Sequence, residues 1–128
     1  MAAVAGRTYP AVKFEIDPEH VSAFARAIGA DPAQGVPPTY AAVYSLGATA
    51  PQLFGDEDAA LDFSHLLHAE QAFEWARHPK AGETVISRGR VVSDTERRGM
   101  RFIRFETETT GADGRPVCKS SALFVIRS

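Results

Sequence analysis

The sequence predicts an α+β protein in which one curved antiparallel sheet encloses an apolar helix. The first observation is an uncharged run at residues 36–54, in a chain of 128 residues of which 23% are charged. The second is a series of strand-like segments joined by turn motifs, which fills the second half of the chain. Because a helix without a charged face has to be covered, we expect the strands to wrap around it.

The uncharged run has the residue spacing of a helix that starts at Pro38. Ala, Ser and Thr occupy the intervening positions, so we expect this helix to be buried on all sides. Three prolines and several polar residues argue against a membrane span, which needs roughly 20 mostly apolar residues. Gly47 costs about 1 kcal/mol relative to Ala inside a helix, which predicts a close approach there by the surrounding sheet or by a bound ligand. The residues at helical spacing are Tyr40, Val43, Tyr44, Gly47, Ala48 and Pro51.

Two elements are expected before this helix. Residues 9–16 mix aromatic and β-branched side chains, which is typical of a short strand or an extended edge segment. Asp17 and Pro18 then form a helix start, and Gly29 supplies the stop. The connection that follows is too short and too rich in Pro and Gly for another element.

The second half of the chain reads as four strands. Residues 66–77 alternate, which predicts that Leu67, Ala69, Phe73 and Trp75 face the core while His68, Glu70 and Glu74 share the polar face. Strands at residues 84–95, 100–110 and 117–127 follow, joined by Arg97-Arg98-Gly99 and by Ala112-Asp113-Gly114-Arg115. Together the elements form a single predicted domain over residues 1–128.

Composition excludes several classes of function. The net charge of −2 and the pI near 6.1, with scattered Lys and Arg, lack the basic surface of a nucleic-acid binder. Cys118 is the only cysteine, so no internal disulfide forms, and the histidines show no metal-site spacing. We interpret the acidic residues 56–62 as a surface connection and expect no metal or cofactor. The opening residues do not resemble a signal peptide, which favours the cytoplasm.

Several segments resemble the MaoC-type hot-dog proteins, and more narrowly the branch called FAS1-like dehydratase or MaoC N-terminal domain. They are residues 67–75, Ala81-Gly82-Glu83-Thr84, Glu96-Arg97-Arg98-Gly99 and Val125-Ile126-Arg127, in this order around a Val-Pro-Pro-Thr-Tyr helix start. That branch includes the non-catalytic subunits of mycobacterial hydroxyacyl dehydratases. The resemblance implies two hot-dog chains paired edge to edge, with an acyl tunnel at their interface. It also implies fatty acid metabolism, in which water is added to or removed from an (R)-specific enoyl/3-hydroxyacyl pair on coenzyme A or acyl carrier protein.

The chain departs from the active branch at the groups that the reaction needs. That branch carries an Asp and, five residues later, a His before the central helix, with a Gly near the helix start as oxyanion donor. Here Asp31 is followed five residues later by Val36, and Pro37 and Pro38 remove two backbone N–H donors. His68 and Glu70 are the candidate substitutes as an acid/base pair, although a surface histidine beside a solvated glutamate is the simpler interpretation.

The candidate substrate-binding residues lie on the helix and at one hairpin. Tyr40, Val43, Tyr44 and Gly47 are expected to line the acyl tunnel, so the ligand close to Gly47 would be an acyl chain. Arg97 and Arg98 can meet the phosphates of the carrier, or they belong to a solvent-exposed turn.

Two functions from different classes remain open. In the first, the chain is a binding subunit that pairs with a catalytic MaoC-type chain. In the second, it is a self-sufficient homodimeric enoyl-CoA hydratase, or an acyl-CoA thioesterase that uses Asp31, Glu70 or His68.

Overall fold

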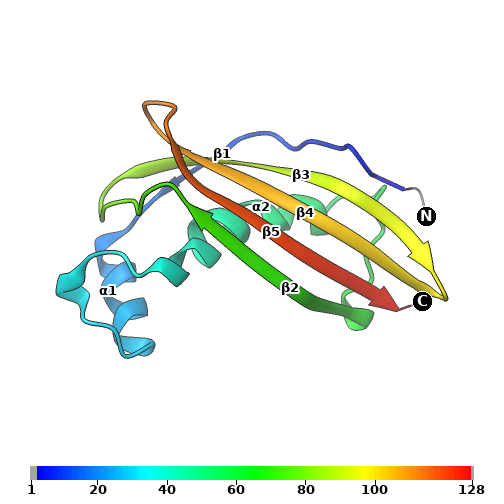
Figure 1. Cartoon of the computed structure of the whole chain (residues 1–128), viewed down its shortest axis with the longest axis horizontal. Helices are drawn as coiled ribbons and strands as arrows, with labels where there is room; N and C mark the ends of the chain where they lie inside the picture. The colour runs from blue at the N-terminus through cyan, green and yellow to red at the C-terminus, as the bar shows by residue number, and fades with distance from the viewer. Residues whose placement is uncertain (1–2, 128) are drawn as a thin grey trace.

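A five-stranded antiparallel sheet forms the body of the molecule (Figure 1). The computed structural model describes residues 3–127, so residues 1, 2 and 128 of the predicted domain lie outside the described part. The strands are β1 (Val12–Glu15), β2 (Leu66–Trp75), β3 (Thr84–Arg97), β4 (Met100–Gly111) and β5 (Pro116–Arg127), in the spatial order β1-β3-β4-β5-β2. This arrangement confirms the predicted antiparallel sheet. Strands β3, β4 and β5 pair in chain order, and β1 and β2 lie at the two edges.

The predicted central helix is present, but it is not regular. It begins as a 3-10 turn, η2 (Pro38–Tyr40), continues as a π-helical segment, η3 (Ala42–Leu46), and ends as α2 (Gly47–Phe54). The sheet curves over one side of this helix (Figure 1). On the other side Ala42, Gly47 and Pro51 are exposed. The expectation that the helix is buried on all sides was therefore wrong, because the sheet of one chain covers only one side.

Gly47 is explained by the π-helical turn. Its N–H bonds to the carbonyl of Ala42, five residues earlier, and a Cβ built on Gly47 would lie 2.9 Å from that oxygen. The prediction that the sheet approaches Gly47 was wrong. The group that leaves no room for a side chain belongs to the helix itself, because the wider turn brings a carbonyl oxygen over this position.

The helix before it, α1 (Pro18–Ala27), follows the sequence signals. The Asp17 side chain accepts a hydrogen bond of 3.0 Å from the Glu19 N–H, and Pro18 occupies the first turn. Val21 and Ala25 are buried. A single 3-10 turn, η1 (Pro32–Gln34), is all that forms in the connection to the central helix, and a similar turn, η4 (Phe63–His65), precedes β2.

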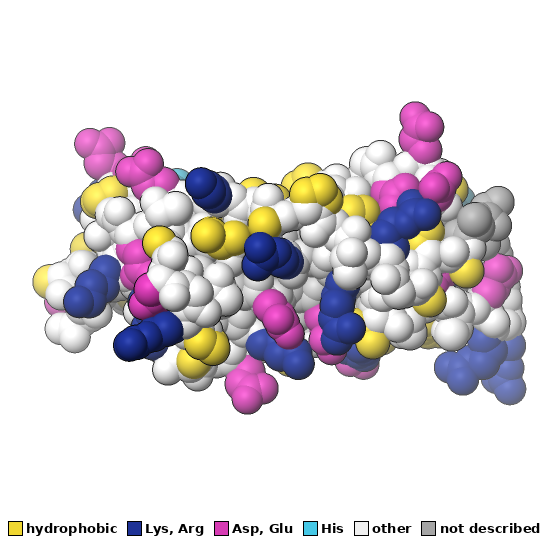
Figure 2. Space-filling model, turned by 90° about the horizontal axis from the view of Figure 1, so that it is seen from above, with side chains coloured by type: hydrophobic (Ala, Val, Ile, Leu, Met, Phe, Trp, Pro, Cys, Tyr) yellow, Lys and Arg dark blue, Asp and Glu magenta, His cyan; other side chains and the backbone are white. Residues whose placement is uncertain are grey.

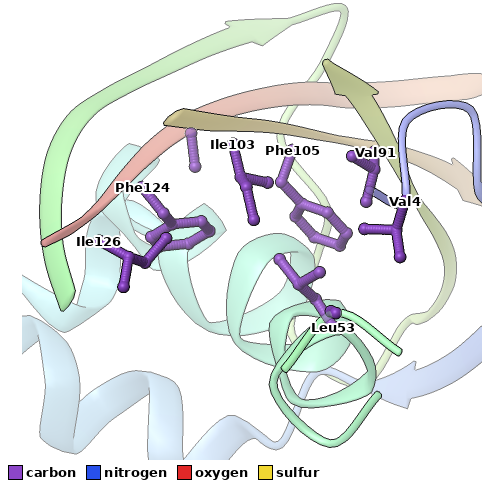
Figure 3. Close-up of a cluster of buried hydrophobic side chains, with 9 residues drawn as sticks. Val4, Leu53, Val91, Ile103, Phe105, Phe124 and Ile126 are labelled. Atoms are coloured by element: carbon purple, nitrogen blue, oxygen red, sulfur yellow. The ribbon is translucent and has the colours of Figure 1, made fainter. Parts of the chain in front are cut away.

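The interior divides into two apolar clusters. The first lies around the end of the central helix, where side chains from β3, β4 and β5 point toward Leu53 (Figure 3); it comprises Val4, Leu53, Ala59, Val91, Ile103, Phe105, Ala122, Phe124 and Ile126. The second lies around the start of that helix and comprises Ile16, Val21, Val36, Tyr40, Ala41, Tyr44, Val85, Val117 and Cys118. We call them the exit cluster and the entry cluster.

Buried hydroxyl groups join the central helix to the inner face of the sheet. Thr49 bonds to Thr107 at 2.8 Å, and Ser87 bonds to Thr109 at 2.7 Å. Ser87 also donates to the Tyr44 carbonyl at 3.1 Å. Because each bond links groups that are distant in sequence, these contacts fix the helix against β3 and β4.

A buried ion pair closes the exit end. Arg101 donates to both carboxylate oxygens of Asp94, at 2.8 and 2.7 Å, and also to the Ala59 carbonyl. The Val4 N–H donates to the same carboxylate at 2.8 Å. The pair therefore fastens the N-terminal segment and the loop after α2 to the hairpin of β3 and β4.

In the described part of the chain, no helix has the length and apolar character needed to cross a membrane.

Candidate functional site

The segment that leads into the central helix holds Asp31 in a structural role. The Oδ1 atom of Asp31 accepts a hydrogen bond of 2.9 Å from the Ala33 N–H and so caps η1. Five residues later Val36 contributes a buried apolar side chain. Pro37 and Pro38 offer no N–H to a thioester oxygen. The helix entry therefore presents neither an Asp–His pair nor an oxyanion donor at the two prolines.

A histidine from another element lies close to this entry. His20 of α1 places Nδ1 2.6 Å from the hydroxyl of Tyr40, and the two rings meet edge to face at 5.5 Å. The ring of Phe24 also packs edge to face against Tyr40, with 5.1 Å between the ring centroids. Burial, followed by nearby Asp17, raises the pKa of Tyr40. Sequence reasoning missed this contact, because nothing local connects two residues of different helices that lie 20 positions apart.

Tyr44 lies further along the helix, beside Cys118 and Trp75 in the entry cluster. The Tyr44 hydroxyl and the Trp75 Nε1 are both buried, and neither has a hydrogen-bond partner among residues 3–127. Burial raises the pKa of Tyr44 far above its ordinary range, and it also raises the pKa of the Cys118 thiol. The Tyr44 hydroxyl and the Trp75 Nε1 thus lie near each other and near Cys118 without a hydrogen bond of normal geometry, which is costly for a folded chain.

The four predicted tunnel residues do not share one open surface within a single chain. Tyr40 and Tyr44 are buried, Val43 is half-buried and Gly47 is exposed. A depression of about 390 Å³ lies beside the entry cluster at the edge of the sheet. Its lining comes from the strands and comprises Glu74, Trp75, Ala76, Glu108, Thr109, Thr110, Pro116, Cys118 and Lys119.

The prediction that His68 and Glu70 share one face of β2 was wrong. Residue 69 is an extra residue in the pairing with β5, where His68 lies opposite Phe124 and Glu70 lies opposite Leu123. His68 therefore points to the inner side, with its ring 5.0 Å from that of Phe124. Glu70 points to the outer side and pairs with Arg104 at 3.1 Å. A bulge reverses the alternation, so Leu67 is also exposed on the outer side instead of facing the core.

His68 and Glu70 have separate partners as a result. His68 Nε2 lies 3.0 Å from the Oε1 atom of Gln71, whose amide donates to Ser120 Oγ at 2.8 Å. The imidazole of His68 is therefore held between the Phe124 ring and the Gln71 side chain. The geometry brings neither of the two predicted residues to Asp31.

Arg97 and Arg98 occupy the hairpin at the exit end. The guanidinium of Arg97 lies 5.3 Å from the centroid of the Phe102 ring, and Arg98 adopts a left-handed backbone conformation with φ of 54°. The strand β3 has 14 residues and begins beside Glu15, close to α1. A strand of that length spans about 45 Å. Within one chain, the hairpin and the helix entry therefore lie nearly the full length of β3 apart.

The entry end combines an apolar interior with a few polar groups, some of which have no hydrogen-bond partner among the described residues. The His20–Tyr40 contact supplies one titratable pair, and the Tyr44 and Trp75 donors supply two groups that can bond to an oxygen atom. On the face that Figure 2 shows, Lys and Arg side chains are interspersed with Asp and Glu side chains over most of the surface. The arrangement suits an apolar ligand with a polar end better than a polyanion.

Comparison with known proteins identifies the family of this chain. The profile of the family described as FAS1-like, dehydratase domain region, matches residues 3–120. A UPF0336 protein of Saccharopolyspora erythraea is 30% identical over 138 residues, which covers 95% of this chain and 88% of that protein. A UPF0336 protein of Thermobifida fusca is 31% identical over 91 residues, which covers 71% of this chain; the match spans 59% of the length of that relative.

The fold is shared with solved dehydratases. A chain of the C-terminally truncated HadBC complex, a (3R)-hydroxyacyl-ACP dehydratase of Mycobacterium tuberculosis, superposes with a TM-score of 0.75 at 21% identity. The match covers 95% of this chain and 96% of that chain. At this identity the likeness concerns the fold alone. The chain therefore belongs to the FAS1-like dehydratase domain family and has the hot-dog fold of the MaoC-like dehydratases.

Proposed function

We propose that this chain is an acyl-thioester-binding subunit of an (R)-specific enoyl hydratase or 3-hydroxyacyl dehydratase, and that it is not catalytic itself. In this proposal a second hot-dog chain of the catalytic MaoC type completes the acyl tunnel and supplies the Asp–His pair. The observation that carries the proposal is the helix entry, where Asp31 serves as a cap and Val36 and the two prolines follow.

The reaction explains why this entry matters. Hydration of an enoyl thioester needs a base to deprotonate water, an acid for the α-carbon and N–H donors for the thioester oxygen. Acid–base catalysis typically contributes 10²- to 10⁴-fold, and one oxyanion donor about 10²- to 10³-fold. A chain without these groups retains little of the rate. Ligand binding needs none of them.

The exposed side of the central helix supports a binding role. Its exposed residues Ala42, Gly47 and Pro51 are small and uncharged, and Val43 beside them is half-buried. Such a surface is unusual for a helix that faces water, and it suits a second apolar surface or an acyl chain. Tyr40, Val43, Tyr44 and Gly47 stay our candidates for contact with the ligand, and Arg97 and Arg98 stay candidates for its phosphates. Because these arginines lie at the far end of the sheet from the helix entry of their own chain, they would meet the carrier phosphates at the entry of a partner chain.

The alternative is a self-sufficient homodimeric hydratase or thioesterase. One observation favours it: the His20–Tyr40 contact of 2.6 Å places an imidazole beside a phenol at the helix entry. In that function His20 with Tyr40, and not His68 with Glu70, would be the acid–base pair.

Two assays on the purified chain test the proposal. Trp75 is the only tryptophan, so its fluorescence reports binding of a saturated acyl-CoA near the entry cluster, with free coenzyme A as the control. We expect saturable binding that Val43→Glu weakens. We expect no hydration of crotonyl-CoA or of longer enoyl-CoA substrates. Robust turnover by the wild type that collapses in His20→Ala, with Asp31→Asn and His68→Ala as comparisons, would establish the alternative instead.

A further inference from the structure

The strand β2 leaves one side of the sheet open. It is the last strand in the order β1-β3-β4-β5-β2, and among residues 3–127 it pairs only with β5 (Figure 1). Its outer row of backbone N–H and C=O groups is a template for another strand. A hot-dog partner under the proposed function would add a strand here, so the side chains along β2 decide which partner fits.

These side chains change character along the strand. Phe63, just before the strand, is 58% exposed, and Leu67, its second residue, is 63% exposed. After the bulge the outward positions are Glu70, Ala72 and Glu74, all exposed and opposite Leu123, Ser121 and Lys119 of β5. The edge is therefore apolar in its first half and acidic in its second.

The chain neutralises this acidic half only in part. Glu70 pairs with Arg104 at 3.1 Å. Lys119 lies in register with Glu74, but its ammonium lies 3.9 Å from Glu106. Glu74 has no ion pair among the described residues, so its charge is available to a partner.

A second copy of the chain does not complement this edge. Antiparallel self-pairing is two-fold symmetric, so the start of one strand lies against the end of the other. An axis in the middle of β2 sets Leu67 against the acidic half of its partner. An axis in the acidic half sets Glu70 or Glu74 directly or diagonally opposite another carboxylate, which destabilises a strand pair. An axis near Leu67 shortens the paired segment.

We propose that β2 selects a different hot-dog chain over a second copy. The edge strand of that partner would carry basic side chains where it faces Glu70 and Glu74, and apolar side chains where it faces Leu67. The inference rests on the proposed function, because it names the chemistry of the partner that the function requires.

A charge-reversed copy of the chain serves as the model partner. Glu70→Lys and Glu74→Lys reverse the edge, and Arg104→Glu restores the ion pair to residue 70. Equal amounts of this variant and of ¹⁵N-labelled wild type are mixed, and native mass spectrometry counts the three possible dimers. Glu57→Lys, which makes the same change in net charge in an exposed loop, is the matched control. Circular dichroism establishes that each variant is folded.

The expected result is a mixed dimer about tenfold more abundant than the two homodimers together at low salt, where random pairing predicts equal amounts, with the excess lost at high salt. The Glu57→Lys control should pair at random. A wild-type homodimer that gains nothing from mixing would overturn the proposal, as would mixed dimers that form equally well with the control. Acyl-CoA binding, measured separately through Trp75, distinguishes these outcomes from a failure of the proposed function.

Discussion

The two ends of the central helix lie in different surroundings. At the exit end, Leu53 packs among strand side chains, and the buried Arg101–Asp94 pair is fully bonded. At the entry end, the Tyr44 hydroxyl and the Trp75 Nε1 are buried without partners. Orphan donors reduce stability, whereas apolar packing supplies it. The comparison indicates that the exit cluster contributes more to the stability of the fold than the entry cluster does. Under the proposed function, the polar groups of the entry cluster serve a ligand.

Removing the largest ring of the exit cluster should have the largest effect. Phe105 is fully buried against Tyr9 and the central helix end, so Phe105→Ala leaves a cavity. We expect a loss of about 3 to 5 kcal/mol in the free energy of unfolding, measured in urea. Val43→Ala, at a half-buried position of the entry cluster, should cost much less. Equal losses at both positions would contradict the division of labour between the two clusters.

The buried carboxylate of the exit end should make stability depend on acidity. Burial alone would raise the pKa of Asp94, but Arg101 and the Val4 amide lower it overall. A lowered folded pKa means that this stabilisation is complete above about pH 4, the pKa of an unfolded Asp, and is lost as the pH falls through the folded value. Asp94→Asn should cost about 3 to 5 kcal/mol at neutral pH by leaving Arg101 uncompensated.

Urea unfolding of the wild type and Asp94→Asn from pH 7 to pH 2 tests this expectation. The gap between the two proteins should narrow on acidification. A gap that stays constant would show that the pKa of Asp94 is the same in the folded and the unfolded chain, and the assigned direction of its pKa would then be wrong.

Substitution of Gly47 tests the π-helical turn that links the two ends. A Cβ at this position meets the Ala42 carbonyl oxygen at 2.9 Å, so Gly47→Ala should destabilise the chain by about 1 to 3 kcal/mol although Ala is the better helix former. Thermal melts are compared with those of Ala48→Gly, which should lose about 1 kcal/mol through helix propensity alone. A raised melting temperature for Gly47→Ala would show that the turn is a regular α-helix.

The smallest effects should separate the two tyrosines of the entry cluster. Tyr40→Phe removes the bond to His20 and should cost about 1 kcal/mol. Tyr44→Phe removes a buried hydroxyl without a partner, so stability should stay unchanged or rise by about 1 kcal/mol. Paired urea titrations measure the difference. If both substitutions destabilise equally, Tyr44 has a partner in solution and is not reserved for a ligand.

Local signals predicted most of the elements. Asp17 and Pro18 start α1 because a side-chain oxygen and a fixed φ satisfy the first turn of a helix whatever surrounds it. The turns at residues 97–99 and 112–115 predicted the two hairpins, since a positive φ at Gly99 and Gly114 is a property of those residues themselves. The resemblance of the quoted segments to the FAS1-like dehydratases supplied the family.

The candidate site could be predicted much less well. The missing histidine after Asp31 and the two prolines are visible in the sequence, and they carry the proposed function. The His20–Tyr40 contact joins two helices through space, and the orphan donors of Tyr44 and Trp75 result from packing. Neither leaves a periodic pattern in the chain.

The sequence by itself determined the order of the elements, the uncharged helix at their centre and the absence of an Asp–His pair before it. Only the tertiary structure decided which way the side chains of β2 point, because the bulge at residue 69 exists through pairing with β5. The same holds for the side of the helix that stays open, since coverage depends on how far one sheet curves. Backbone preferences act within a few residues, whereas register and coverage are set by contacts between segments that are distant in sequence.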